Sequence, residues 1–113
     1  MAVKNDITKN YSYPLETVIA ALRHPKFGGL LDAPLKEEAK DAEGVEFRFI
    51  RKSDAARYGR NYFVRPTSAA DGSTDVKVII QSRKVTVLLD PKWKTEAERV
   101  FNALDVMLEV VAK

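Results

Sequence analysis

The sequence predicts a single α+β domain, an antiparallel sheet of four to five strands with two helices on one face, in the order β-α-β-β-β-β-α. Two segments near the ends of the chain have apolar residues at helical spacing, and the segments between them alternate apolar with polar residues. Consecutive strands usually pair with their neighbours, which makes the sheet antiparallel. The 113 residues suffice for one hydrophobic core, so we assign residues 1–113 to one domain.

The composition is that of an ordinary globular protein, with 45% hydrophobic residues, 31% charged residues and a net charge of +3. The absence of cysteine excludes disulfides, thiolate catalysis and cysteine-ligated metal sites. A single histidine makes a histidine-ligated metal site improbable, so we expect neither a metal nor a cofactor. The polar N-terminus and the lack of an apolar run of roughly 20 residues predict a cytoplasmic protein with no membrane partner.

The first third of the chain is predicted to form a strand and a helix. Residues 2–9 alternate weakly between apolar and polar, which indicates a short strand. Residues 13–23 have apolar side chains at positions i, i+3, i+4 and i+7, which is typical of an amphipathic helix. His24-Pro25 should end this helix, because the residue before a proline is disfavoured in the α conformation. Residues 27–31 are then predicted to form a turn.

The middle of the chain begins with a densely charged segment. Residues 34–43 are predicted to form either a short exposed helix or a mobile loop. Residues 45–52 and 58–65 alternate apolar with polar side chains and are predicted to be strands. Pro66 should end the second of these strands, because proline cannot donate a hydrogen bond to a neighbouring strand.

The C-terminal third is predicted to contain more β structure and then a long helix. Residues 75–82 and 84–90 are rich in β-branched residues, and they form either a hairpin, which we slightly favour, or one long strand bent by a bulge. Thr95 and Glu98 match a capping box, with Thr95 as the N-cap. The last helix is therefore expected to run from 95 to 112, with a wide apolar stripe facing the sheet.

The sequence favours a non-enzymatic role, because no set of residues forms a catalytic signature and no catalytic residue can be named. His24 lies where a helix ends, and a structural role explains it. The carboxylates at 37–43 are interleaved with Lys36 and Lys40, which is typical of a solvated face rather than of an acid–base pair.

Basic residues concentrate in two neighbouring predicted strands and the turn between them, with aromatic residues interleaved. A sheet face with arginine and aromatic side chains is one way in which folds hold nucleic acid. An exposed sheet face also needs charge to stay soluble, so nucleic acid is a less favoured partner. The candidates for binding a polyanion are Arg48, Arg51, Lys52, Arg57, Arg60 and Arg65.

A long amphipathic helix that crosses a curved antiparallel sheet can leave an apolar cavity beneath it. The alternative is that the same residues simply fill the core, which is the favoured interpretation for so small a domain because protein interiors pack densely. The candidates for lining a ligand pocket are Phe27, Leu30, Phe47, Phe49, Tyr62, Phe101, Leu104 and Leu108.

Apolar residues also fall on the side of the sheet away from the expected core. They are Ile50, Phe63, Ile79 and Leu88, and Val106 interrupts the polar face of the last helix. A two-layer domain with an apolar outer face often pairs with another copy of itself. The favoured interpretation is therefore a small non-enzymatic binding or interaction domain that self-associates as a homodimer.

One segment resembles the strand, small turn and first helix of the helix-grip superfamily of START and polyketide-cyclase-like ligand binders (SRPBCC). It reads Tyr11-Ser12-Tyr13-Pro14-Leu15-Glu16-Thr17-Val18-Ile19-Ala20-Ala21-Leu22. The final helix at 95–112 fits the same pattern. The resemblance implies a protein that binds an apolar small molecule, although members usually have six or more strands and only four follow the first helix here.

The order of one strand, one helix, four strands and one helix is also similar to the TATA-box-binding-protein-like fold. Only topology carries this second resemblance, so it implies a fold and no functional residue. Two alternatives to the self-associating domain therefore stay open. One is a reduced helix-grip protein that binds an apolar small molecule, and the other is a nucleic-acid binder that uses the basic sheet face.

Overall fold

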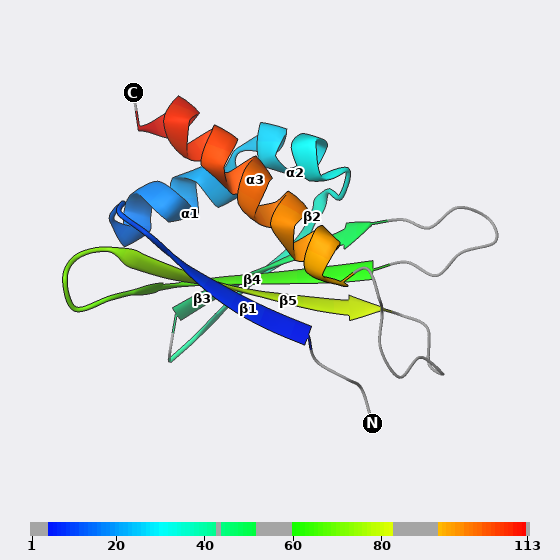
Figure 1. The fold of residues 1–113 in the computed structure, drawn as a ribbon, viewed down its shortest axis with the longest axis horizontal. Coiled ribbons are helices and arrows are strands. Elements are labelled where there is room, and N and C mark those ends of the chain that lie inside the picture. The colour runs from blue at the N-terminus through cyan, green and yellow to red at the C-terminus, as the bar shows by residue number, and fades with distance from the viewer. Residues whose placement is uncertain (1–4, 43, 52–59, 83–92, 113) are drawn as a thin grey trace.

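The computed structural model describes residues 5–42, 44–51, 60–82 and 93–112 (Figure 1). It shows a layer of helices on one face of an antiparallel sheet, which confirms the predicted α+β class. A third helix joins the two that were expected. The elements are β1 (Asn5–Tyr11), α1 (Leu15–Arg23), α2 (Pro25–Leu31), β2 (Leu35–Asp41), β3 (Gly44–Arg51), β4 (Arg60–Ser68), β5 (Thr74–Ser82) and α3 (Trp93–Val111).

The five strands lie in the order β1-β5-β4-β3-β2, and every neighbouring pair is antiparallel. Strands β2 to β5 follow one another as neighbours, and β1 returns to pair with the last of them. The chain therefore crosses the sheet between β1 and β2, and α1 and α2 make this crossing on the same face as α3 (Figure 1). This arrangement leaves β1 and β2 as the two edge strands among the described residues.

The predicted turn at residues 27–31 is wrong, because this segment belongs to helix α2. His24 ends α1 with an extended backbone (φ −64°, ψ 133°), and Pro25 then begins α2, where its missing N–H has no helical partner to lose. The Nδ1 atom of His24 accepts a hydrogen bond from the backbone N–H of Lys26 at 3.1 Å. The same His-Pro pair thus ends one helix and caps the next.

The two interpretations offered for residues 34–43, an exposed helix or a mobile loop, are both wrong, because the segment contains strand β2. All seven residues of β2 are exposed, which is why its sequence has no apolar alternation to identify it. A charged edge strand is one way in which proteins prevent unwanted pairing with other strands. The charge density therefore reflects the position of the strand in the sheet rather than the absence of regular structure.

Several predicted boundaries are also wrong, including the end of the first strand, which continues past residue 9 to Tyr11. Strand β4 continues through Pro66 to Ser68, and it can do so because its pairing with β3 ends at Val64. Beyond Val64 the described residues pair β4 with β5 alone, so the missing N–H of Pro66 falls where one side of the strand has no partner. Helix α3 begins at Trp93, so Thr95 lies inside its first turn and is not the N-cap. Residues 84–90, with their two possible arrangements, lie outside the described residues.

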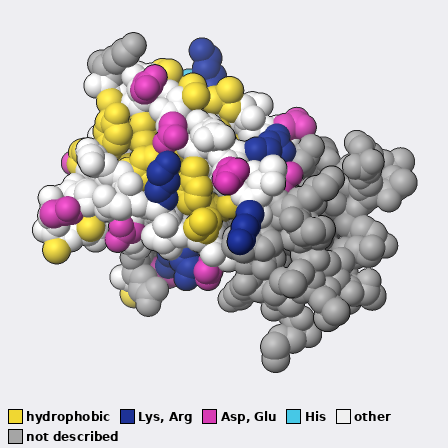
Figure 2. All heavy atoms as spheres, in the orientation of Figure 1, with side chains coloured by type: hydrophobic (Ala, Val, Ile, Leu, Met, Phe, Trp, Pro, Cys, Tyr) yellow, Lys and Arg dark blue, Asp and Glu magenta, His cyan; other side chains and the backbone are white. Residues whose placement is uncertain are grey.

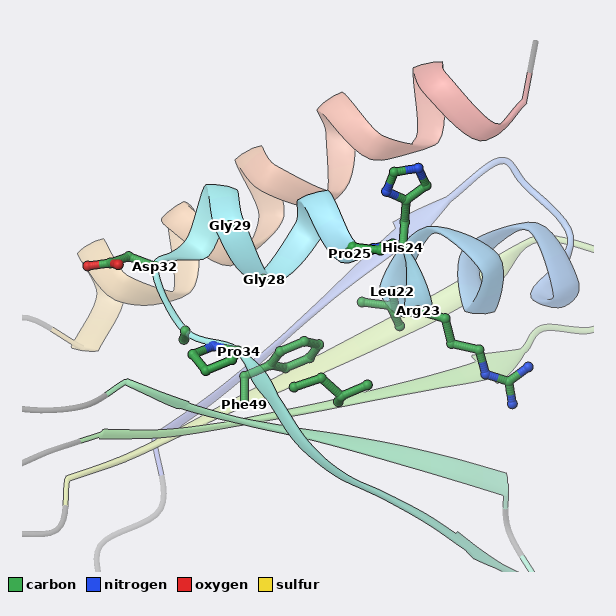
Figure 3. Close-up of a pocket in the computed structure, with 11 residues that line it drawn as sticks. Leu22, Arg23, His24, Pro25, Gly28, Gly29, Asp32, Pro34 and Phe49 are labelled. Carbon is green, nitrogen blue, oxygen red and sulfur yellow. The ribbon is translucent and has the colours of Figure 1, made fainter.

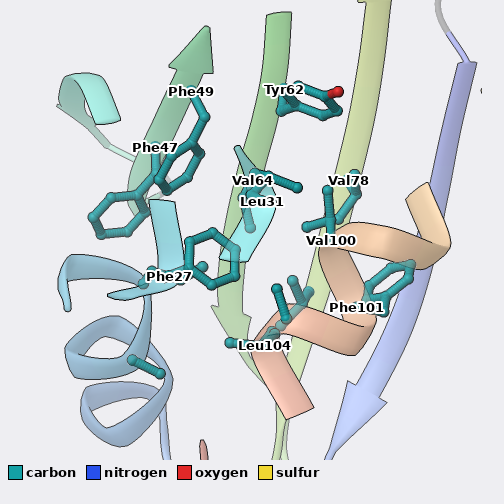
Figure 4. Packing of buried hydrophobic residues seen from close by; sticks show 14 of the residues in the cluster. Phe27, Leu31, Phe47, Phe49, Tyr62, Val64, Val78, Val100, Phe101 and Leu104 are labelled. Atoms are coloured by element: carbon teal, nitrogen blue, oxygen red, sulfur yellow. The ribbon is translucent and has the colours of Figure 1, made fainter. Parts of the chain in front are cut away.

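The hydrophobic core lies between the helices and the sheet (Figure 4). Alternate residues of the three central strands point into it, and α1, α2 and α3 cover them with one apolar face each. The rings of Phe27 and Phe49 meet edge to face with their centroids 5.0 Å apart, which joins α2 to β3. The largest fully buried side chains of the core are those of Tyr62, Phe27, Phe47, Phe49, Leu22, Leu31, Ile80, Leu104, Met107, Leu108, Val18 and Val64.

The edge strand β1 is held to α3 by a mixed aromatic and charged contact. The ammonium group of Lys9 lies 5.3 Å from the ring centroid of Tyr11 and 5.8 Å from that of Phe101. Lys9 also lies 3.9 Å from a carboxylate oxygen of Asp105. Burial raises the pKa of the Tyr11 hydroxyl above its ordinary value, and the nearby carboxylate of Asp105 raises it further. This contact closes the side of the core opposite to β2.

The two glycines of α2 should respond differently to substitution by alanine. A Cβ atom on Gly28 would lie 3.1 Å from the backbone oxygen of Ala33, whereas a Cβ atom on Gly29 would meet nothing within 4 Å. We expect Gly29→Ala to raise the free energy of unfolding by about 1 kcal/mol, since alanine is the better helix former. Gly28→Ala should lack this gain, and urea denaturation will compare the two. Equal stabilisation by both variants would contradict the close approach at Gly28.

Candidate functional site

A pocket of about 410 Å³ lies where the junction of α1 and α2 faces the β2 edge of the sheet (Figure 3). Ligand pockets in proteins commonly range from about 300 to 1,000 Å³, so this one could hold a small molecule or a large side chain. It is lined by Leu22, Arg23, His24, Pro25, Gly28, Gly29, Asp32, Ala33, Pro34, Leu35 and Phe49.

The centre of the pocket is apolar. Leu22, Ala33 and Phe49 are almost completely buried and form its inner wall. Leu35 is 40% exposed and lies at the start of β2, so it provides apolar surface that is open to solvent. An apolar group that enters the pocket would exchange water for contact with this surface, which is favourable in proportion to the area covered.

The three ionisable residues of the pocket lie at its rim. Figure 3 shows that the side chains of Arg23, His24 and Asp32 point away from the apolar centre. The Nε atom of Arg23 donates to a carboxylate oxygen of Glu38 on β2 at 3.0 Å, and this hydrogen bond raises the pKa of the arginine. The pocket therefore presents an apolar interior with charge only at its edges.

Three backbone irregularities shape the pocket. His24, which has an extended backbone, separates α1 from α2. Asp32 ends α2 in the left-handed conformation (φ 57°, ψ 37°). The pairing of β2 with β3 then shifts register between Leu35 and Glu37. Bulges of this kind often lie beside binding sites, where they redirect a strand. Here the chain turns at both ends of α2 and again at the start of β2, so these segments surround a space that none of their side chains fills.

The eight residues predicted to line a cavity do not form this pocket together. Seven of them are buried in the core, with exposed fractions of 0–6%, and only Phe49 also lines the pocket. The eighth, Leu30, is 50% exposed on the outer side of α2. The described space beneath α3 is occupied by these side chains (Figure 4), and the pocket lies at the β2 edge instead.

The residues that sequence reasoning missed are Leu22, the Gly28-Gly29 pair and the segment 33–35. A glycine pair, a proline and a few aliphatic residues give no chemical signal of a site. Only the position of β2 at the edge of the sheet brings 33–35 against α2. Gly28 was assigned to a turn, although its close approach to the Ala33 backbone is the packing role that glycine serves in this helix.

A polar cluster, buried except for its arginine, joins α3, β4 and α2 beside the apolar core. The hydroxyl of Tyr62 donates to Oε2 of Glu96 at 2.6 Å, and both side chains are buried. Arg99 donates to the same carboxylate oxygen at 3.1 Å and to the backbone oxygen of Leu31 at 3.2 Å. Because Leu31 is the last residue of α2, the cluster fixes the end of the helix that forms one wall of the pocket.

The predicted polyanion-binding residues do not present a free basic surface where they are described. Arg48 lies 3.4 Å from Glu37, and Arg65 lies 3.0 Å from Asp41 and 3.3 Å from Glu46. The surface described in Figure 2 likewise mixes basic and acidic side chains. The side chains of the other four candidates, Arg51, Lys52, Arg57 and Arg60, lie outside the described residues.

Similarity to known proteins is found in the structure and not in the sequence. No family model and no curated protein matches the sequence. A Staphylococcus aureus protein of unknown function, SA2116, has a similar structure, with a TM-score of 0.51, 14% identity, and coverage of 99% of this chain and 96% of the other. The structure of Ara h 8.0201 is also similar, with a TM-score of 0.50 and 10% identity. The match covers 97% of this chain and 99% of the other. At these identities the similarities bear on the fold alone, and they are consistent with a helix-grip-like α+β fold.

The described helices include none that is long and apolar enough to cross a membrane. Over the same residues, no group of three or more histidine, aspartate or glutamate side chains is placed to hold a metal ion.

The buried cluster should contribute measurably to stability. Tyr62→Phe removes the hydroxyl and leaves the Glu96 carboxylate, whose side chain is 7% exposed, without one of its donors. We expect the free energy of unfolding to fall by about 1–3 kcal/mol, as for other buried groups that lose a hydrogen bond. Tyr13→Phe is the matched control, because the half-buried Tyr13 makes no side-chain hydrogen bond among the described residues. Similar losses in both variants would contradict a specific role for the cluster.

Proposed function

We propose that this chain is a non-catalytic binding domain that takes an apolar group into the pocket between α1, α2 and the β2 edge of the sheet. The observation that carries the proposal is the apolar interior of a pocket of about 410 Å³ with ionisable groups only at its rim. Small-molecule sites have this composition, in which apolar contacts supply affinity and a few polar groups fix orientation.

The rim residues support binding rather than catalysis. Arg23 is engaged by Glu38, and Nδ1 of His24 is engaged by the backbone of Lys26. A general base needs a partner that orients it toward a reacting group. His24 instead uses one ring nitrogen to hold the helix, and its side chain points away from the apolar interior (Figure 3).

A relationship to helix-grip ligand binders belongs to this proposal. It is supported by the helix layer on one face of the sheet and by the structural similarity described above. The proposed site differs from a cavity beneath the long helix, because the core under α3 is occupied in the described residues. The chain would then be a reduced member of the group that holds its ligand at the edge strand.

Self-association is a second candidate function, and a different surface supports it. Ile50, Phe63 and Ile79 lie on three neighbouring strands, on the side of the sheet away from the helices, and each is half-buried. Phe63 lies directly opposite Ile79 in the pairing of β4 with β5. Apolar side chains on the sheet face away from the helices are typical of a surface that pairs with another copy. Leu88, predicted to share this face, lies outside the described residues.

The test of the pocket uses N-phenylnaphthylamine, an uncharged apolar probe whose fluorescence rises when it is bound. Leu35→Asn removes apolar surface from the pocket, and we expect it to weaken binding about tenfold, or ~1.4 kcal/mol. The matched control is Leu30→Asn, which changes a leucine of comparable exposure (50% against 40%) outside the pocket. An unmodified protein that does not bind the probe, or equal effects of the two substitutions, would contradict the proposed site.

The test of self-association is the molar mass in solution. We expect light scattering to give the mass of a dimer, and Ile79→Glu to shift the protein to a monomer because it buries a charge in the interface. Lys77→Gln, on the same face and two residues away, should leave the dimer intact. A monomer at high protein concentration, before any substitution, would count against this candidate.

A further inference from the structure

Strand β2 offers an unpaired backbone edge directly beside the proposed pocket. It is the last strand in the sheet order, and no strand among the described residues pairs with its outer side. All of its seven residues are exposed. An edge of this kind presents N–H and C=O groups that can pair with another extended chain.

The uncompensated charge of this edge is positive. Each acidic side chain of β2 is paired with an arginine from a neighbouring element, as Glu37 with Arg48, Glu38 with Arg23, and Asp41 with Arg65. Lys36 and Lys40 form no ion pair within the described part of the chain. A partner that meets β2 therefore encounters two free ammonium groups and carboxylates that are already neutralised.

The pocket lies within reach of the side chains of a strand added along β2. Leu35 is both the first residue of β2 and part of the pocket wall, and the pocket opens on the helix side of the sheet. The side chains of an extended strand alternate between the two faces of a sheet. A strand added along β2 would thus direct every second side chain to the helix side, where one of them can reach the apolar interior.

We propose that β2 binds an extended acidic peptide segment as an additional strand of the sheet. One apolar side chain of the peptide enters the pocket, and its carboxylates lie beside Lys36 and Lys40. Backbone hydrogen bonds supply affinity and the pocket supplies specificity, as in other cases of strand addition. The inference rests on the proposed function of the pocket and names the partner that the pocket receives.

The charges of β2 argue against a second copy of this chain as the partner. Antiparallel pairing of two β2 strands about their centre would place Lys36 of each copy opposite Lys40 of the other. Like charges directly opposite each other destabilise a pair of strands. An acidic partner meets no such repulsion, because within the described part of the chain the charged residues of β2 that lack an ion pair are Lys36 and Lys40.

The experiment measures the fluorescence anisotropy of a labelled seven-residue peptide that carries one leucine among glutamates. Lys40 lies opposite Val45 of β3 and so on the same face of the sheet as the pocket, which means that the peptide needs its leucine and a glutamate on one face. We expect saturable binding that displaces N-phenylnaphthylamine and weakens as salt is added. The double variant Lys36→Gln, Lys40→Gln should weaken binding about tenfold, whereas Lys26→Gln, which changes an exposed lysine of α2, should not. The same peptide with N-methyl groups on alternate residues should not bind, because it cannot donate the hydrogen bonds of an added strand.

The outcomes separate the two proposals. If the uncharged probe binds in the pocket but the peptide does not bind, the strand-addition inference is wrong and the proposed function stands. If the lysine variant binds the peptide as tightly as the unmodified protein, the lysines serve only to keep the edge from pairing, and the inference is also wrong. If neither the probe nor the peptide binds, the pocket itself is not a binding site.

Discussion

The contact between Phe27 and Phe49 determines most of what surrounds the pocket. Both rings are almost fully buried, and their edge-to-face packing fixes α2 above β3. Helix α2 has only seven residues, two of them glycine, so its own propensity is too weak to hold it in place. Tertiary burial of Phe27 and Leu31 keeps the segment helical. The pocket is the space left on the outer side of this contact, between the start of β2 and the junction of α1 with α2.

The electrostatic arrangement of β2 complements this apolar anchor. Its acidic residues are joined to arginines of α1, β3 and β4, so ion pairs link the edge strand to three other elements. Exposed pairs of this kind each contribute little to stability. Their more important effect is on the charge that a partner meets, because they leave Lys36 and Lys40 as the residues of β2 that form no ion pair with another described residue.

The parts of the fold that could be predicted are those in which the sequence period matches the structure. Helices α1 and α3 and strands β3 to β5 have apolar residues at the spacing of their own secondary structure, and each was identified. Helix α2 and strand β2 could not be found in this way. The proline and the two glycines of α2 are not typical of a helix, so the sequence does not indicate one there. All seven residues of β2 are exposed, so its sequence does not alternate between apolar and polar residues. Both elements form because of contacts with distant parts of the chain, which local sequence does not record.

The pocket could not be predicted from the sequence for the same reason. Seven of the eight cavity candidates are core residues, because the large apolar side chains that mark a cavity in sequence are also those that fill an interior. The pocket instead depends on where small residues, a proline and two helix ends meet, and none of these has a distinctive pattern. A small domain must use its largest side chains to close its core. Its binding surface is then expected at an edge, where a strand and a short helix each leave one side unpaired.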